Sequence, residues 1–150
     1  MPHRVNLLLA LLVVGSLLLT GCPEAARLIP GLNTVELVLI NDSDFPVDPN
    51  IRFDDDAGWL AGLFPAEELG SGLIEPGETV VLRFDCDELG LIFSDEAEQL
   101  VPIFGVYIAG ATDILEREEE YDCGDVIGFR FVGNAEDFGV IVSVNGRIVD

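Results

Sequence analysis

Short runs in which apolar and polar residues alternate recur along this chain, and they constrain its fold more than any other feature. Side chains of a β-strand point alternately to opposite faces, so such a run predicts a strand with one buried and one solvated face. In residues 34–41, Val35, Leu37 and Leu39 share one face. The other clear runs are residues 79–86, 126–132 and 138–144.

Turn residues separate these runs. Asn145-Gly146 lies between two apolar runs and predicts a tight hairpin, while Pro76-Gly77 predicts a turn over residues 75–78. Residues 103–109 are almost uniformly apolar, which predicts a central strand. Residues 47–53 predict a weaker strand at a sheet edge, because Pro49 cannot donate to a neighbouring strand.

Helical signals are confined to residues 58–64 and residues 94–100. The second begins with Ser94 as an N-cap, followed by acidic residues in its first turn. Several short strands with turns between them predict an all-β protein, an antiparallel β-sandwich with one or two short helical turns. The layout resembles that of immunoglobulin-like domains.

The N-terminal residues predict an export segment. Arg4 precedes an apolar run over residues 5–19, and a membrane-spanning helix needs a longer run of roughly 20 residues. The run closes with Leu19-Thr20-Gly21-Cys22. This tetrapeptide resembles the lipobox of bacterial lipoproteins, in which the cysteine becomes the lipid-modified N-terminus.

The resemblance implies that residues 1–21 are a signal peptide, residues 22–33 a lipid-anchored linker and residues 34–150 the folded domain. Acyl chains such as palmitate on Cys22 would hold the protein on a membrane of the bacterial cell envelope. Residue 23 is Pro, not the Asp that retains some lipoproteins at the inner membrane, which favours the outer membrane.

The three cysteines then divide into one anchor and one pair. With Cys22 acylated, Cys86 and Cys123 remain, and an even pair in an exported protein predicts a disulfide. Two free buried thiols are the alternative.

Charge and residue identity exclude much chemistry. The formal net charge is −21, which repels phosphates and excludes nucleic acid as a partner. His3 lies in the segment predicted to be removed, and the chain has no lysine. The mature protein therefore cannot build a Ser-His-Asp or Cys-His nucleophile, a lysine Schiff base or a histidine-ligated metal site. A carboxylate-based hydrolase ranks last, because no spacing marks an acid–base pair.

Four aspartates surround the predicted disulfide. Asp85 and Asp87 flank Cys86, while Asp122 and Asp125 lie beside Cys123. The disulfide would bring these carboxylates together, where they form either a solvated acidic rim or a calcium site. The sequence predicts no cofactor other than this possible calcium. The aspartates at 42–48 and 54–56 lack the spacing of an EF-hand and predict turns.

Two further segments are candidates for contacts. Residues 59–64, which begin with Trp59 and end with Phe64, are apolar and lie in a connecting segment. They either cap an open end of the sandwich or form an exposed patch for an envelope protein or a glycan. The charged run at residues 116–120 predicts a solvated edge.

The leading hypothesis is a non-enzymatic, envelope-anchored lipoprotein that acts as a binding or structural module. The alternative is a calcium-dependent adhesion or assembly domain that uses the clustered acidic loops.

Overall fold

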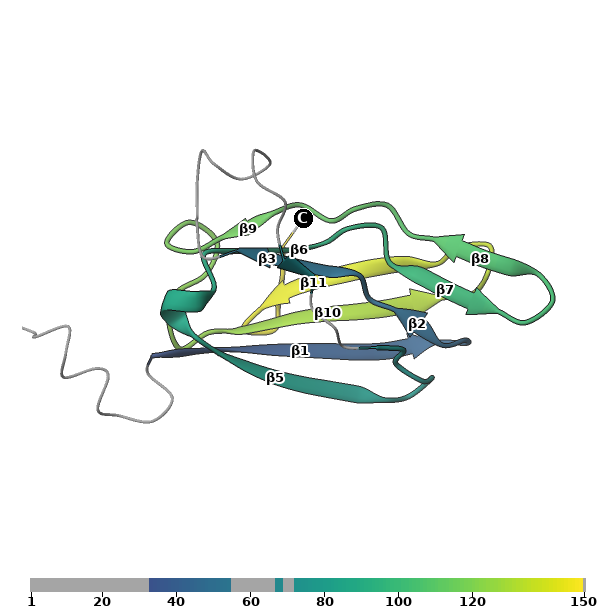
Figure 1. The fold of residues 1–150 in the computed structure, drawn as a ribbon, viewed down its shortest axis with the longest axis horizontal. Coiled ribbons are helices and arrows are strands. Elements are labelled where there is room, and N and C mark those ends of the chain that lie inside the picture. The colour runs from purple at the N-terminus through teal and green to yellow at the C-terminus, as the bar shows by residue number, and fades with distance from the viewer. Residues whose placement is uncertain (1–32, 55–66, 69–71, 150) are drawn as a thin grey trace, which may run out of the picture. The chain divides into compact units, whose positions relative to one another are not determined.

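The computed structural model describes residues 33–54, 67–68 and 72–149, all within one compact unit, Asn33–Asp150 (Figure 1). The unit Met1–Leu32 lies outside the described residues. The described part is all-β apart from one short 3-10 helix, as the sequence predicted. The elements are β1 (Thr34–Ser43), β2 (Val47–Asp48), β3 (Ile51–Asp54), β4 (Glu67–Glu68), β5 (Thr79–Asp85), η1 (Cys86–Glu88), β6 (Leu91–Ser94), β7 (Glu98–Val101), β8 (Gly105–Ile108), β9 (Leu115–Glu116), β10 (Val126–Gly133), β11 (Gly139–Val144) and β12 (Arg147–Ile148).

One layer of the sandwich is a five-stranded sheet with the order β12–β11–β10–β1–β5. β1 and β10 are parallel, in a register that runs from Glu36 opposite Val126 to Ser43 opposite Gly133. All other strand pairs are antiparallel. The parallel pair departs from the predicted antiparallel pairing. It arises because the chain leaves the end of β1, builds the opposite layer, and returns to begin β10 beside the beginning of β1.

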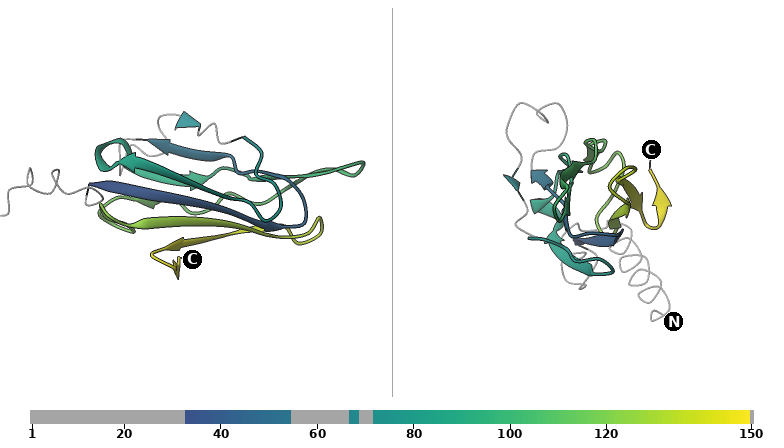
Figure 2. Two further views of the ribbon diagram at one scale, coloured as in Figure 1. Left: turned by 90° about the horizontal axis from the view of Figure 1, so that it is seen from below. Right: turned by 90° about the vertical axis from the view of Figure 1, so that its right-hand side faces the viewer.

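The opposite layer consists of two short sheets, with the orders β2–β7–β8 and β4–β3–β6–β9. Each strand of the first short sheet is next in the chain to a strand of the second: β2 to β3, β7 to β6, and β8 to β9. These three pairs occur in the same order across the two sheets. The two sheets therefore continue one another, and Figure 2 shows them facing the five-stranded sheet.

A backbone interruption separates these two short sheets. Asn50 and Glu96 have positive φ angles of 44° and 59°, which end β2 and separate β6 from β7. The Asp95 amide donates to the Asn50 carbonyl at 2.9 Å, and the Asn50 side chain donates to the Asp95 carbonyl. The prediction of one edge strand over residues 47–53 is therefore wrong. β2 lies at an edge, whereas β3 lies inside the second sheet.

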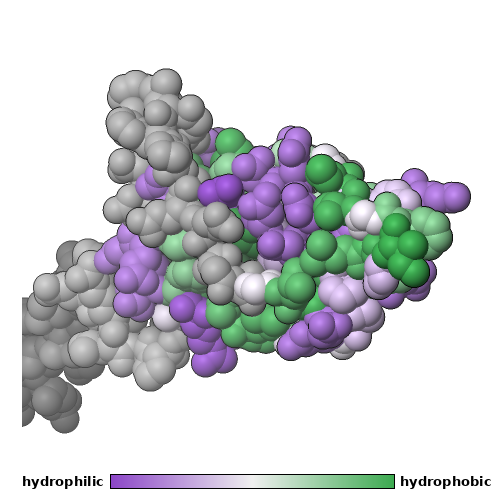
Figure 3. All heavy atoms as spheres, turned by 45° about the vertical axis from the view of Figure 1, so that its right-hand side comes forward, coloured by the Kyte–Doolittle hydropathy of each residue, from purple (hydrophilic) through white to green (hydrophobic). Residues whose placement is uncertain are grey.

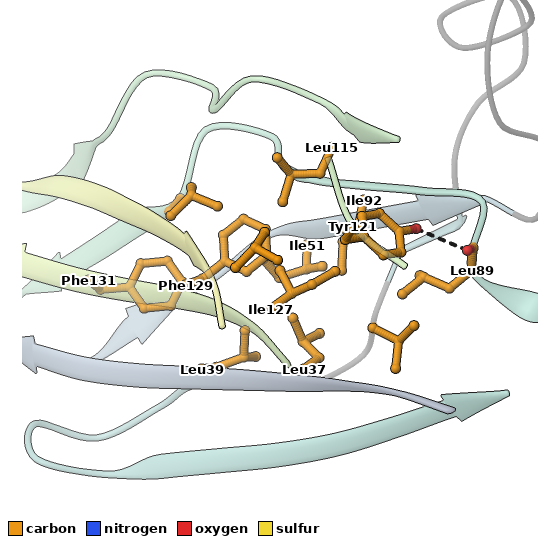
Figure 4. Close-up of a cluster of buried hydrophobic side chains, with 14 of the residues drawn as sticks. Leu37, Leu39, Ile51, Leu89, Ile92, Leu115, Tyr121, Ile127, Phe129 and Phe131 are labelled. Carbon is orange, nitrogen blue, oxygen red and sulfur yellow. Dashed lines mark hydrogen bonds between the residues drawn. The ribbon is translucent and has the colours of Figure 1, made fainter. Parts of the chain in front are cut away.

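The core fills the space between the layers (Figure 4). Alternate residues of the central strands β1 and β10 are fully buried there, and the predicted inward faces are confirmed. From the opposite layer, Ile51, Ile92 and Leu115 pack against them. The buried residues of the two central strands are Val35, Leu37, Leu39, Ile127, Phe129 and Phe131.

Both predicted turns are confirmed. Asn145 and Gly146 adopt φ angles of 50° and 75° and join β11 to β12, as a tight hairpin with two left-handed residues requires. Gly77 has a φ of 79°, and the Glu78 amide donates to the Glu75 carbonyl at 2.9 Å.

The predicted helix over residues 94–100 is wrong. The Ser94 hydroxyl donates to the Pro49 carbonyl at 2.9 Å instead of capping a helix. The chain turns at Glu96 and continues as β7, in which Gln99 and Val101 are buried on one face. The other predicted helical segment, residues 58–64, lies outside the described residues.

The predicted central strand over residues 103–109 is also wrong. β8 is the edge strand of its sheet, and Val106 and Ile108 are exposed. The uniform apolar character of this run therefore reflects an exposed surface and not burial on both faces.

The predicted disulfide between Cys86 and Cys123 is confirmed, with a Cα–Cα distance of 5.6 Å. It lies where β1 begins: the Cys86 amide donates to the Asn33 carbonyl, and the Gly124 amide to the Thr34 carbonyl, both at 2.9 Å. The bridge therefore joins the segment after β5 to the segment before β10, and these two segments flank the start of β1.

Removing this disulfide should destabilise the domain. The cysteines are 37 residues apart, and closing a loop of this size is worth about 4 kcal/mol in the chain-entropy model. We expect Cys86→Ser combined with Cys123→Ser to lower the free energy of unfolding by about that amount, measured by urea denaturation. Equal midpoints for the wild type and the variant would contradict a stabilising role for the bridge.

Tyr121 closes the core at the same end of the molecule. Its side chain is buried, and its hydroxyl donates to the Leu89 carbonyl at 2.9 Å (Figure 4). Burial raises the pKa of the Tyr121 phenol, and the nearby Arg117 charge only partly opposes this.

This raised pKa predicts a loss of stability in alkali. An unfolded tyrosine ionises near pH 10, so above about pH 10 the unfolded state loses the proton that the folded state keeps, and stability falls as pH rises. We expect Tyr121→Phe to cost about 1 kcal/mol at pH 7, through the lost hydrogen bond, and to weaken the alkaline decline. Urea unfolding at pH 7 and pH 10.5 measures both effects, with Tyr107→Phe as the matched control. An unchanged decline in Tyr121→Phe would exclude this tyrosine as its source.

Candidate functional site

The hairpin formed by β7 and β8 extends beyond the rest of the sandwich at one end (Figure 1). At its tip, Ile103 is 100% exposed and Phe104 is 76% exposed. The Phe104 amide donates to the Val101 carbonyl at 3.2 Å, so the tip is a closed turn. Large apolar side chains fully exposed at a tip are unusual in a soluble domain and indicate a contact surface.

The base of this hairpin is held firmly. β7 pairs with β2 as well as with β8. The Leu100 amide donates to the Pro46 carbonyl and the Ala109 amide to the Ala97 carbonyl, both at 2.9 Å. Gln99, fully buried at the base, donates through Nε2 to the Gly133 carbonyl at 3.5 Å. The exposed tip is therefore carried on a fixed support.

We call the exposed apolar side chains at this end the hairpin patch. Figure 3 shows hydrophobic residues gathered there. Beside them lies an open hollow of about 590 Å³, whose lining from Pro46, Leu73 and the hairpin includes no charged residue. The patch consists of Leu73, Ile103, Phe104, Val106 and Ile108.

The charge around the hairpin patch sets it apart from the rest of the chain. Residues 99–112 include no charged side chain, and this is the longest uncharged run after Cys22. The whole chain carries a formal charge of −21. The tip and most of the hairpin therefore form an uncharged, apolar surface on a strongly acidic protein, while Glu98, at the base of β7 opposite Ile108, carries a charge.

Ile103 also has a strained backbone. Its φ is +75°, a left-handed conformation that a β-branched residue adopts at a cost of about 1–2 kcal/mol. Asn or Gly would relieve this cost, yet the position holds a large apolar residue that contacts solvent on all sides. Strain of this kind is typical of sites that serve a function other than stability.

A second hollow, of about 480 Å³, lies between residues 110–115 and the strands β11 and β12. Asp113 and Glu120 are the ionisable side chains in its lining. Glu120 accepts a hydrogen bond from the Glu116 amide at 2.8 Å, and Thr112 accepts one from the Ser94 amide at 2.9 Å. These polar groups are engaged in holding loops, and the lining offers no nucleophile paired with a base.

The four aspartates proposed for calcium lie at the disulfide end of the sandwich, where β1 begins. The Asp125 carboxylate accepts from the Asp122 amide at 2.8 Å and from the Asn145 side chain at 2.7 Å, and Asp85 is the N-cap of η1. No group of three or more His, Cys, Asp or Glu within the described residues is arranged to hold a metal ion. The calcium alternative stays a prediction from the sequence, without support from side-chain geometry.

Of the other predicted site residues, some lie outside the described part of the chain and some lie within it. Cys22, Trp59 and Phe64 lie outside the described residues. Glu116 ends β9, and Glu118–Glu120 form an exposed turn after it, consistent with the solvated edge that was predicted.

The hairpin patch does not follow from the sequence pattern. A uniformly apolar run such as residues 103–109 predicts a buried central strand, because apolar residues are more often buried than exposed. The signal that could have revealed it is the tip sequence Pro102-Ile103-Phe104-Gly105, in which Pro and Gly mark a turn and place the two large residues between them.

Comparisons with known proteins give a likeness of fold alone. No protein-family model and no curated protein matches the chain. Among solved structures, listeriolysin O is similar over 74% of this chain, with 8% identity and a TM-score of 0.52. A Gram-negative toxin is similar over 75%, with 7% identity and a TM-score of 0.51.

A structure described as a trapped toxin is similar over 73% of this chain, with 10% identity and a TM-score of 0.50. The chain spans less than a quarter of the length of each of these three proteins: 22%, 23% and 23%. Within the described residues of this chain, no helix is long and apolar enough to cross a membrane.

The strain at Ile103 can be measured. Asn tolerates the left-handed region, so Ile103→Asn should raise the free energy of unfolding by about 1 kcal/mol even though it removes an apolar side chain. Val106→Asn on the adjacent strand, which replaces a β-branched residue in a strand, is the matched control and should not stabilise. Thermal unfolding of both variants measures this effect. A melting temperature of Ile103→Asn below that of the wild type would contradict the strain at Ile103.

Proposed function

We propose that this protein is a non-enzymatic, envelope-anchored lipoprotein that acts as a binding module, and that the hairpin patch is its contact surface. The observation that carries the proposal is the full exposure of Ile103, in a strained conformation, at the tip of a hairpin whose residues 99–108 carry no charge, on a strongly acidic domain. A residue that costs stability and gains no packing is retained most simply for a contact outside the domain.

The position of the patch supports this role. β1 begins at Thr34 beside the disulfide and ends at Ser43, near Gly133 and the base of the hairpin. Asn33, the first described residue, lies at the disulfide end, whereas the hairpin of β7 and β8 lies at the other end of the sandwich (Figure 1). A domain anchored through the predicted linker, residues 22–33, would carry its apolar tip at the end away from Asn33.

The chemistry of the described hollows agrees with binding better than with catalysis. One hollow is lined by apolar residues, and in the other the Glu120 carboxylate and the Thr112 hydroxyl each accept a hydrogen bond from a backbone amide. The disulfide agrees with an oxidising compartment outside the cytoplasm.

Two measurements test the proposal. Metabolic labelling with a palmitate analogue should mark the protein, and Cys22→Ala should abolish the label. A photo-crosslinking phenylalanine analogue at Phe104 should give adducts in intact cells, because the aromatic ring at the tip meets the partner directly.

The same analogue at Glu119, an exposed residue at the disulfide end, is the matched control for the second measurement. Adducts at position 104 that exceed those at 119 support a contact surface at the tip. Equal yields at the two positions would refute it.

A further inference from the structure

We propose that the free edge of β8 pairs with the β8 edge of a second copy of this chain, antiparallel about a two-fold axis at Tyr107. This inference rests on the proposed function, because it uses the hairpin patch, and it names the partner. Three observations support it: unpaired backbone groups along β8, the absence of charge along this edge, and the projection of the hairpin from the sandwich.

The backbone of β8 is paired on one side and free on the other. The Leu100 amide donates to the carbonyl just before β2, so the neighbours of Leu100 in β7 direct their backbone groups toward β8. One of these neighbours, Gln99, lies opposite Tyr107, which is therefore bonded to β7. Val106 and Ile108 then direct their amides and carbonyls to the outer edge. No hydrogen bond from another described element reaches these groups.

β8 also differs from the other described edge strands in having no guard against pairing. Natural proteins block edge strands with charged side chains, with proline or by keeping the strand very short. Here β2, β4, β9 and β12 have two residues each, and β5 carries Arg83 and Asp85. β8 has four residues, Gly105–Ile108, with neither charge nor proline. Of the edges that the described strands form, this one is therefore open to a further strand.

The free groups of β8 are arranged so that two copies satisfy one another. An antiparallel pair about Tyr107 places Val106 of one copy opposite Ile108 of the other, and such a pair exchanges two backbone hydrogen bonds. The two-fold axis generates a second pair of the same kind. The side chains of Val106 and Ile108, which are 48% and 56% exposed, become cross-strand neighbours that stabilise the joined sheet. The hydrocarbon of a bilayer would offer these backbone groups no partner.

The distribution of charge favours a contact at this edge. The chain carries a formal charge of −21, so two copies repel one another and a carboxylate within the interface would oppose pairing. The register about Tyr107 pairs residues 102–112 with themselves, and this whole segment is uncharged. Glu98, the charged residue of the hairpin, lies on β7 opposite Ile108 and is one strand away from the interface. Two acidic copies can therefore meet here without like charges side by side.

The place of the hairpin in the fold lets two copies approach. The hairpin extends beyond the rest of the sandwich at one end (Figure 1). A two-fold axis at Tyr107 points the two hairpins in opposite directions, so the two acidic sandwiches lie on opposite sides of the interface. Ile103 and Phe104 of each copy then lie next to Gly110 and Ala111 of the other, small residues that leave room for the tip.

The interface is short, and contacts of this size are typically transient. Copies held on one membrane by the proposed anchor would pair more often than copies in solution, because the shared surface raises their effective concentration. The pairing should therefore exchange rapidly and is best detected by trapping it covalently.

Disulfide trapping in the full-length chain tests the inference. The two Tyr107 residues would form a non-hydrogen-bonded pair with Cα atoms about 4.5 Å apart, a separation that a disulfide can span. Cells that express Tyr107→Cys are lysed without detergent, and their membrane and soluble fractions are both oxidised with copper phenanthroline. Dimer is measured by non-reducing gel electrophoresis.

Two controls accompany this measurement. Val81→Cys is the matched control, because Val81 is 50% exposed and lies on the edge strand β5. The wild-type chain, oxidised in parallel, gives the dimer that forms through the native cysteines.

We expect Tyr107→Cys to give more dimer than Val81→Cys, and its yield should rise with salt, which screens the repulsion between acidic copies. Adding Val106→Pro should lower the yield by about thirtyfold, since two hydrogen bonds are lost across the interface and each is worth about fivefold. The Val106 amide faces the open edge, so the hairpin keeps its own hydrogen bonds, and proline is tolerated on edge strands.

A pair of charge changes tests the register without proline. In the Tyr107→Cys chain, Ile108→Glu should lower the dimer yield, because it places a carboxylate at the interface, across from Glu98 on β7. Adding Val106→Arg should restore the yield, because the two new side chains face one another across the two-fold axis.

Each failure has a distinct meaning. Equal dimer yields at positions 107 and 81, or a yield at 107 that neither Val106→Pro nor Ile108→Glu lowers, would overturn strand pairing between copies. If the cellular photo-crosslinks at position 104 then still exceed those at 119, another partner, a membrane included, occupies the patch and the proposed binding function stands. Trapped dimers without an excess of photo-crosslinks at 104 would uphold the pairing and refute the tip as a contact surface.

Discussion

The parallel pairing of β1 with β10 is the interaction on which the rest of this structure depends. Its register places the buried Leu37 and Leu39 beside Ile127 and Phe129, so one continuous apolar surface forms at the centre of the five-stranded sheet. Parallel neighbours need a long connection, and here the connection is the whole opposite layer together with β5. The opposite layer therefore covers the core, because the chain passes across the core on its way from the end of β1 to the start of β10.

This arrangement gives the domain two ends with different properties. At one end the disulfide, Tyr121 and the braced carboxylate of Asp125 tie together the segments that surround the start of β1. At the other, a hairpin with an uncharged tip projects with its apolar side chains in solvent. These contacts hold the end at which β1 begins, and the strained, exposed tip lies at the opposite end. This division agrees with the proposed role as a binding module.

Much of the fold could be predicted because alternation reports directly on burial. The strands around Leu37, Leu82, Phe129 and Val142 each show apolar residues on one face, and each forms in the sheet with that face inward. The failures are also instructive. Residues 94–100 have local helical signals, but Ser94 bonds to Pro49, a residue distant in sequence, and tertiary pairing overrides the local preference. Residues 103–109 carry no alternation, so their burial could not be judged from pattern alone.

By itself, the sequence determined the strand class, the turns at Gly77 and Asn145-Gly146, and the pairing of Cys86 with Cys123, because each follows from local periodicity, backbone preference or cysteine count. Only the tertiary structure decided that β1 and β10 are parallel, that the opposite layer is interrupted at Asn50, and that the apolar run near Phe104 is exposed. These features depend on which strand lies next to which. An edge strand and a central strand can share one composition, and the neighbouring strand, which local sequence does not encode, makes the difference.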